Sequence, residues 1–390
     1  MNRPNYKPSS LAACHNIADL RHLAQRRLPR VMFDYIDGAA EDEVSLSRNQ
    51  SDFSQYSLVP RTLTDVSSVN LRTRIQGIDS ALPLLFSPTG GQRLFHHAGE
   101  LATAPVAAEQ GLIYTVSSMS THSIEAVAAC NKATKWFQIY VWKDRGVVKE
   151  FIARCKASGY HALVLTVDVQ TSGQRERDLR NGFTLPPRFT TSSLIDMALH
   201  PSWWWHTLTK PRITLANVIG KGELGVNTST ELGKYAASQL DPSVSYDDLA
   251  WMMQEWGGPF LVKGLVSAAD AKRATDLGAS GLMLSNHGGR QLDHTISPIS
   301  ALPAVVDAVG GRAELIVDGG IRRGTDIIKA LSLGATACSI GRPYLYGLAA
   351  GGKPGVERAI AILANELKRA MMLLGCDDVK KLGPQYLQAR

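Results

Sequence analysis

Residues 285–293 read S-N-H-G-G-R-Q-L-D and hold the residue types in this chain that are best suited to chemistry. They follow an apolar run at 281–284 of the kind that forms a buried strand, so this polar cluster lies where a strand ends and a loop begins. The two glycines between His287 and Arg290 let the backbone turn sharply and aim both side chains into one cleft. His287 would supply a base that titrates near neutral pH, and Arg290 a planar fork that fits a carboxylate. A His-x-x-Arg pair in isolation is more often part of an ordinary polar surface loop. Whether this pair is catalytic therefore depends on what the rest of the chain places around it.

Polar side chains follow other apolar runs in the same way. They are Thr89, Ser117, Ser118, Gln138, Tyr140, Thr166, Asp168, Lys263, Asp318 and Arg342. Lys263 could place a positive charge beside a group that becomes anionic, as the N1–C2=O region of a flavin does on reduction. A lysine in this position can also form a Schiff base, which leaves an aldolase or isomerase as an alternative.

Two glycine-rich stretches predict a phosphate site. D-G-G-I-R-R-G occupies 318–324 and G-R-P occupies 341–343, where backbone N–H groups, a helix N-terminus and an arginine commonly bind phosphate in a barrel enzyme. A phosphorylated cofactor is therefore expected. No G-x-G-x-x-G stretch follows an early strand, so a nicotinamide dinucleotide on a Rossmann fold is not supported.

The elements that must position these residues follow a repeating pattern. Eight short apolar runs alternate with segments of helical character, at 82–87, 112–117, 136–141, 162–167, 260–263, 281–285, 314–318 and 337–341. This alternation predicts a (β/α)8 TIM barrel, whose active site forms at the carboxyl ends of the strands, where the polar residues gather. We expect a single domain over 1–390, with an N-terminal helical segment at 1–80, the barrel at 81–350 and a C-terminal helical segment at 351–390.

One connection is much longer than the others and predicts an insertion after strand four, at about 180–245. Residues 200–206 in it read H-P-S-W-W-W-H, and Lys210 and Arg212 follow. Adjacent tryptophans with basic neighbours suit the headgroup region of a membrane. The alternative is that these rings pack on the barrel or on a neighbouring subunit.

Composition excludes several classes of protein. The net charge of +7 is modest for 390 residues, and Lys and Arg are not clustered with aromatic residues, which argues against a nucleic-acid partner. The five cysteines lie far apart without a C-x-x-C pair, which favours free thiols and argues against a metal site. No apolar run reaches the roughly 18 residues of a membrane-spanning helix, and no signal peptide is recognisable. We expect a cytoplasmic protein that contacts the inner face of the cell membrane peripherally.

Three motifs together resemble a known family. S-N-H-G-G-R-Q-L-D at 285–293, D-G-G-I-R-R-G-T-D at 318–326 and F-D-Y-I-D-G-A-A-E-D at 33–42 are similar to the FMN-dependent 2-hydroxy-acid oxidases and dehydrogenases, which include L-lactate and L-mandelate dehydrogenases. The resemblance covers nearly the whole chain. It implies FMN as cofactor, a small 2-hydroxy acid as substrate, and a homo-oligomer, a tetramer in the family.

The resemblance also implies roles for individual residues. His287 would be the base, with Asp168 orienting its imidazole and stabilising the imidazolium. Arg290, Arg175 and Tyr35 would bind the substrate carboxylate, Tyr140 would hydrogen-bond the substrate oxygen, and Lys263 would stabilise the reduced flavin. The implied FMN ligands are Thr89, Gly90, Ser117, Gln138, Thr166, Lys263, Ser285, Asp318, Gly320, Arg322, Gly341 and Arg342. Met119 departs from the pattern, since some oxidases of the family carry Trp there.

These observations predict oxidation of an L-2-hydroxy acid of the lactate or mandelate class to the 2-oxo acid. The tryptophan segment and Gly90 resemble the dehydrogenases, which favours a quinone-type electron acceptor. An oxidase that reduces O2 to hydrogen peroxide is the alternative. Whether His287 takes the α-carbon proton, or the hydroxyl proton while hydride leaves, stays open because both routes use the same residues.

Overall fold

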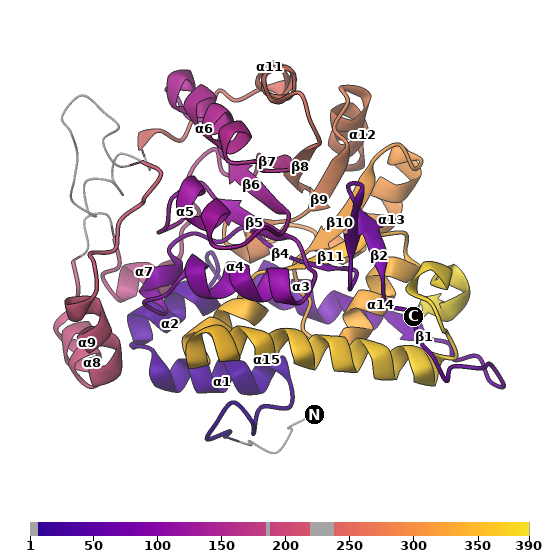
Figure 1. The fold of residues 1–390 in the computed structure, drawn as a ribbon, viewed down its shortest axis with the longest axis horizontal. Coiled ribbons are helices and arrows are strands. Elements are labelled where there is room, and N and C mark those ends of the chain that lie inside the picture. The colour runs from indigo at the N-terminus through magenta and orange to yellow at the C-terminus, as the bar shows by residue number, and fades with distance from the viewer. Residues whose placement is uncertain (1–6, 185–187, 219–237, 390) are drawn as a thin grey trace.

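A computed structural model describes residues 7–184, 188–218 and 238–389. Eight parallel strands close into a barrel in which each strand pairs with the next along the chain and the last pairs with the first (Figure 1). The strands are β4 (Leu84–Phe86), β5 (Tyr114–Ser117), β6 (Lys135–Ile139), β7 (Ala162–Thr166), β8 (Phe260–Leu265), β9 (Gly281–Leu284), β10 (Glu314–Asp318) and β11 (Ala337–Ile340). The predicted TIM barrel is confirmed, and each predicted run overlaps one of these strands.

Side chains fill the interior of the barrel, so it is a packed core and not a channel. A buried cluster there takes alternate residues from most of the strands, with Trp136 of β6 as its largest member. The hairpin of β2 (Thr73–Ile75) and β3 (Ile78–Ser80) packs Ile75 into the same cluster. Because the interior is filled in this way, a ligand has to bind at the carboxyl ends of the strands.

Helices form the outer layer of the barrel (Figure 1). They are α4 (Glu100–Glu109), α5 (Ile124–Ala129), α6 (Arg145–Ala157), α11 (Tyr246–Trp256), α12 (Ala268–Asp276), α13 (Pro298–Val309), α14 (Gly324–Ser332) and α15 (Arg342–Leu374). The long helix α15 is interrupted at Gly351 and Gly352, whose backbone angles are not helical. Its second half lies beside the N-terminal helix α1 (Ile17–Arg27), which covers the outside of the barrel (Figure 1).

The N-terminal segment contains α1, α2 (Arg30–Asp37) and α3 (Val44–Ser51), and its α-helical part ends there. Residues 52–80 instead contribute the single-turn helix η1 (Asp52–Gln55), β1 (Tyr56–Leu58) and the β2–β3 hairpin. Strand β1 pairs antiparallel with β12 (Leu387–Ala389), which joins the two ends of the chain. α1 begins with a side-chain cap, because Asn16 accepts a hydrogen bond from the Asp19 amide at 2.9 Å.

The insertion follows β7 and contains α7 (Glu176–Arg180), α8 (Thr191–Ala198) and α9 (Pro201–Thr209). Helices α8 and α9 pack together at one side of the molecule (Figure 1). The indole Nε1 of Trp203 donates to the Leu94 carbonyl at 2.8 Å, whereas Trp205 is 59% exposed. The tryptophans are therefore divided: Trp203 packs on the protein, and Trp205 faces outward. Residues 185–187 and 219–237 of the predicted insertion lie outside the described residues.

No helix within the described ranges is both long and apolar enough to cross a membrane. The same residues hold no group of three or more His, Cys, Asp or Glu side chains that could bind a metal ion.

Candidate active site

The loop after β9 holds His287 in an unusual backbone conformation. His287 has φ +57°, and Gly288 and Gly289 follow with φ +66° and +76°. Three successive residues with positive φ make a tight turn that a non-glycine residue adopts only at some cost. Asn286 stabilises the turn because its side chain accepts the Gly289 amide at 3.1 Å. The turn places the imidazole over the carboxyl end of the barrel.

Asp168, which follows β7, contacts the imidazole of His287, which follows β9. It lies two residues after β7, and its Oδ1 is 2.9 Å from His287 Nδ1. Both side chains are largely shielded, with 13% of Asp168 and 25% of His287 exposed. A carboxylate can only accept, so this contact fixes the proton on Nδ1 and leaves Nε2 able to accept one. The predicted His287–Asp168 pair is thus brought together.

Two arginines meet at the ring of Tyr35, which comes from α2. The guanidinium carbon of Arg290 lies 4.9 Å from the ring centroid and that of Arg175 lies 5.2 Å away. Arg290 is held by Nη1, which donates to the Tyr35 carbonyl at 2.6 Å and the Gly38 carbonyl at 3.1 Å. Burial, followed by the charge of Arg175, lowers the pKa of Arg290 to about 10. Two cations side by side, one of them buried, attract an anion such as a substrate carboxylate.

Helix α2 is anchored so that Tyr35 can reach the barrel. Burial by itself would raise the pKa of Asp37, but the hydrogen bond and charge of Arg21 together with Tyr346 and Arg342 outweigh it, and the pKa is lowered. Arg21 Nη2 donates to Asp37 Oδ2 at 2.7 Å, and the hydroxyl of Tyr346 donates to Oδ1 at 2.8 Å. Helices α1, α2 and α15 are therefore held together at this carboxylate.

Lys263 lies at the centre of a buried polar network. Its Nζ is 2.8 Å from Asp318 Oδ2 and donates to Ser285 Oγ at 3.0 Å. Ser285 Oγ in turn donates to Asp318 at 2.9 Å. Burial opposes a charge on Lys263, but the carboxylates of Asp318 and Asp168 outweigh it, so its pKa is raised. The strand ends therefore hold a fixed ammonium group, which excludes the neutral amine that Schiff-base formation needs.

Several of the predicted FMN ligands present unsatisfied polar atoms. Gln138 Nε2 and Thr166 Oγ1 are buried and have no hydrogen-bond partner within the described part of the chain. Gln138 Oε1 accepts from Ser117 Oγ at 2.9 Å, which holds the amide in place. Buried polar groups without partners are rare in proteins. These residues therefore fit a cofactor such as FMN, whose polar ring edge can bond to them.

Close packing requires two of the three glycines predicted to bind FMN, Gly90 and Gly320. A Cβ on Gly90 would come within 2.8 Å of Met119 Cβ, and a Cβ on Gly320 within 1.7 Å of the Asn49 carbonyl. Gly320 also has φ +82°. Gly341 precedes α15 and has ordinary contacts only.

Some predicted FMN ligands already have partners in the protein. Thr89 Oγ1 lies 2.6 Å from the Tyr344 hydroxyl, and Arg322 Nη1 donates to the Ile321 carbonyl at 2.8 Å. Arg342 donates to three carbonyls, those of Ile36, Gly38 and Gly288, at 2.8–2.9 Å. Arg342 thus holds α2 against the His287 loop, and its contact with a phosphate stays a prediction.

Sequence reasoning missed three positioning residues. Asn49 of α3 exchanges two 2.8 Å hydrogen bonds with the side chain of Asn286. Asp178 is buried 3.3 Å from Arg175 Nε, and Phe95 stacks on Tyr35 with centroids 6.1 Å apart. Only the Arg175–Asp178 pair had a signal in the sequence, because oppositely charged residues three positions apart face each other on a helix.

Comparison with known proteins shows which family the chain matches. The family model described as FMN-dependent dehydrogenase matches residues 24–389. An L-lactate oxidase from Nostoc is 43% identical over 95% of this chain and 97% of its own length. An L-lactate dehydrogenase from Caulobacter vibrioides is 39% identical over the same shares of the two chains. A solved (S)-mandelate dehydrogenase, described as a monotopic membrane protein, superposes with a TM-score of 0.93 at 38% identity, over 97% of this chain and all of that one.

Proposed function

Because the chain belongs to the FMN-dependent dehydrogenase family and is an FMN-dependent 2-hydroxy-acid oxidoreductase, we propose that it oxidises an L-2-hydroxy acid of the lactate or mandelate class and passes the electrons to a membrane quinone. The observation that carries the substrate class is that the His287–Asp168 pair and the guanidiniums of Arg290 and Arg175 lie around one group, Tyr140, on which the charges of Asp168 and both arginines act. A 2-hydroxy carboxylate needs both a base and a carboxylate clamp, held in fixed geometry.

FMN at this site would accept the two electrons that leave the substrate α-carbon. Arg290 and Arg175 bind the carboxylate and orient the substrate hydroxyl and α-carbon toward His287 Nε2. His287 takes a proton there, and Asp168 stabilises the imidazolium that results. Burial raises the pKa of Tyr140, so its hydroxyl stays protonated and donates to a substrate oxygen. Lys263, with Gln138 and Thr166, would hold the cofactor, and its positive charge would stabilise the reduced flavin.

An exposed apolar surface supports a membrane acceptor. Helices α8 and α9 and the turn between them carry five large apolar residues that are 54–74% exposed: Leu194, Ile195, Leu199, Trp205 and Leu208. Exposed apolar residues gathered in this way on two short helices suit insertion into the headgroup layer of a membrane. The solved (S)-mandelate dehydrogenase described as monotopic has the same fold. We propose that this surface, termed here the α8–α9 face, brings the protein to the membrane that holds the quinone.

The second candidate is an oxidase that produces hydrogen peroxide, because an L-lactate oxidase is among the most similar relatives. Anaerobic mixing with (S)-lactate, (S)-mandelate or glycolate measures flavin bleaching and identifies the substrate. The reduced enzyme is then exposed to air or to decylubiquinone. Faster reoxidation by the quinone supports the proposal, whereas rapid peroxide formation in air with slow quinone reoxidation supports the oxidase. Absence of bleaching with all three acids would contradict the substrate class.

A further inference from the structure

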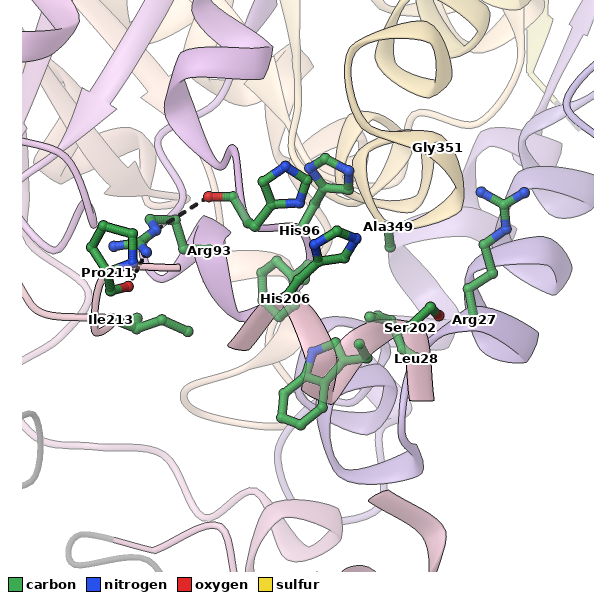
Figure 2. A pocket seen from close by; sticks show the side chains of 13 residues that line it. Arg27, Leu28, Arg93, His96, Ser202, His206, Pro211, Ile213, Ala349 and Gly351 are labelled. Atoms are coloured by element: carbon green, nitrogen blue, oxygen red, sulfur yellow. Dashed lines mark hydrogen bonds between the residues drawn. The ribbon is translucent and has the colours of Figure 1, made fainter. Parts of the chain in front are cut away.

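A pocket of about 260 Å³ lies outside the candidate active site, between the η2 (Gln92–Leu94) loop and α9 (Figure 2). Residues from the end of α1 and from α15 complete its walls. Helix α9 is held over it by Trp203, whose indole donates to the Leu94 carbonyl. The segment after α9 is held by Arg93, which donates to the Arg212 carbonyl at 3.1 Å and to the Pro211 carbonyl. The pocket is thus formed where the insertion packs against the barrel.

Three imidazoles line the pocket in a continuous stack. The ring centroids of His96 and His97 are 4.3 Å apart, and those of His97 and His206 are 4.4 Å apart. His96 and His206 lie between Arg93 on one side and Arg27 on the other (Figure 2). The Nδ1 atoms of His97 and His206 are buried and lack a hydrogen-bond partner within the described residues. Such atoms indicate a ligand that carries polar atoms of its own.

The two arginines at the pocket direct their hydrogen bonds to protein carbonyls, and two of its imidazoles are neutral. Arg27 donates to the Ala350 carbonyl, and Arg93 donates to three carbonyls, those of His97, Pro211 and Arg212. Burial, reinforced by the neighbouring His97, lowers the pKa of His96 to about 4, and burial also lowers the pKa of His97. Both imidazoles are therefore neutral near pH 7, when each can donate from one nitrogen and accept at the other.

The walls suit a flat ring. Phe95 and Trp203 supply aromatic surface, and Leu28 and Ile213 supply aliphatic surface. Aromatic side chains bind a planar ring by stacking, and the volume suits one ring rather than a large ligand. A quinone ring presents two carbonyl acceptors, and the quinol presents two hydroxyl donors. A neutral imidazole can hydrogen-bond to either form by changing its tautomer.

The location links the pocket to both the active site and the membrane. Phe95 lines the pocket and also stacks on Tyr35, which contacts Arg290 and Arg175. This aromatic pair connects the wall of the pocket to the substrate clamp. On α9, Trp205 and Leu208 belong to the α8–α9 face and do not line the pocket. Helix α9 therefore contributes residues both to the α8–α9 face and to the wall of the pocket.

From this geometry we infer that the pocket binds the headgroup of the quinone acceptor, with His97 and His206 as its hydrogen-bonding residues. The inference rests on the proposed function, because it requires a quinone to be the acceptor. The reaction balances: the hydroxy acid loses two electrons and two protons, and the quinone takes up two of each to become the quinol. His97 and His206 lie in the pocket wall, where their ring nitrogens can hydrogen-bond to the oxygens of the quinone and of the quinol.

Two changes test the pocket. Ser202→Trp replaces an exposed residue of the lining and fills the pocket, while His97→Phe with His206→Phe keeps two rings and removes their nitrogens. The matched control is Ser192→Trp, an exposed residue of α8 that does not line the pocket. We expect both pocket variants of the holoenzyme to bind decylubiquinone about tenfold more weakly by isothermal titration calorimetry, since each lost hydrogen bond is worth a few-fold in affinity. Their reoxidation by decylubiquinone should fall in parallel.

Flavin reduction by the hydroxy acid, and turnover with the soluble dye dichlorophenolindophenol, should stay within about twofold of the parent in all variants. Parent-like quinone binding and reoxidation in both pocket variants would overturn the site but leave the proposed function intact. A parent enzyme that the dye reoxidises but decylubiquinone does not would refute the proposed acceptor, and the site with it. If the variants lose only binding to phosphatidylglycerol vesicles, the pocket holds a lipid phosphate and the quinone assignment is wrong.

Discussion

Replacing Asp168 by Asn tests how much the charge beside His287 contributes to the reaction. The two side chains are 2.9 Å apart and mostly shielded from solvent. When His287 becomes an imidazolium, an ion pair about 4 Å between charge centres is worth about 4 kcal/mol at an effective dielectric constant of about 20. The charge-assisted hydrogen bond alone is worth about 1.5–3 kcal/mol. Because His287 is partly exposed, about 4 kcal/mol is an upper limit, so we take about 2–4 kcal/mol.

That free energy corresponds to flavin reduction slower by about 30- to 1,000-fold in Asp168→Asn. Bound FMN should be retained, because the FMN ligands predicted from the sequence do not include Asp168. Anaerobic stopped-flow mixing with the preferred substrate measures the rate, and the visible spectrum measures FMN content. Asp168 is proposed to act only through His287, so adding Asp168→Asn to His287→Gln should cost little more than His287→Gln alone. A single variant within about twofold of the parent, or fully additive losses in the double variant, would refute the reasoning.

Four further outcomes are expected. His287→Gln should keep FMN and slow flavin reduction about 100- to 10,000-fold, and an unaltered rate would remove His287 as the base. Arg290→Lys keeps the charge but loses the planar guanidinium that the carbonyls of Tyr35 and Gly38 hold in place. The value of kcat/KM should therefore fall about tenfold or more for lactate and mandelate alike. Values equal to those of the parent would show that Arg290 does not bind the substrate carboxylate. Changing the exposed Leu199, Trp205 and Leu208 together to Ser should move the protein from the membrane pellet to the supernatant after ultracentrifugation, and unchanged sedimentation would contradict the α8–α9 face. The pKa of His96 in the folded protein, about 4, is below its ordinary value of 6.5, so the stability of the protein should decline as the pH falls from about 6.5 towards 4. In a series of Tm measurements against pH, His96→Gln should reduce that decline and leave the slope above pH 7 unchanged.

The barrel is predictable from local patterns because a strand or a helix is encoded by neighbouring residues. Each strand is a short apolar run, and the residue that ends it points to the active-site face whatever the rest of the chain does. Ser117, Thr166 and Asp318 are assigned to one site by this reasoning alone, because they end β5, β7 and β10. The N-terminal segment is less predictable, since β1 forms by pairing with β12 at the other end of the chain.

The insertion shows what local patterns cannot decide. Trp203 and Trp205 are two residues apart in the same apolar stretch, and the sequence offers membrane contact and packing on the barrel as alternatives. On a helix, two positions correspond to about 200° of rotation, which places the two rings on opposite sides. Trp203 therefore reaches the Leu94 carbonyl while Trp205 remains exposed. Which side faces the barrel depends on how α9 docks, and that is a tertiary contact.

By itself, the sequence determined the fold class, the residue types at the strand ends and the family, because these depend on periodicity and on motifs written in consecutive residues. The tertiary structure decided which distant groups meet. Asp168 Oδ1 lies 2.9 Å from His287 Nδ1, and the guanidiniums of Arg175 and Arg290 lie over the ring of Tyr35 in α2. The stack of His97 on His206 likewise joins the loop after β4 to the insertion. Such contacts arise from chain closure and side-chain packing over long separations, and no pattern of neighbouring residues encodes their distances or the burial that shifts their pKa values.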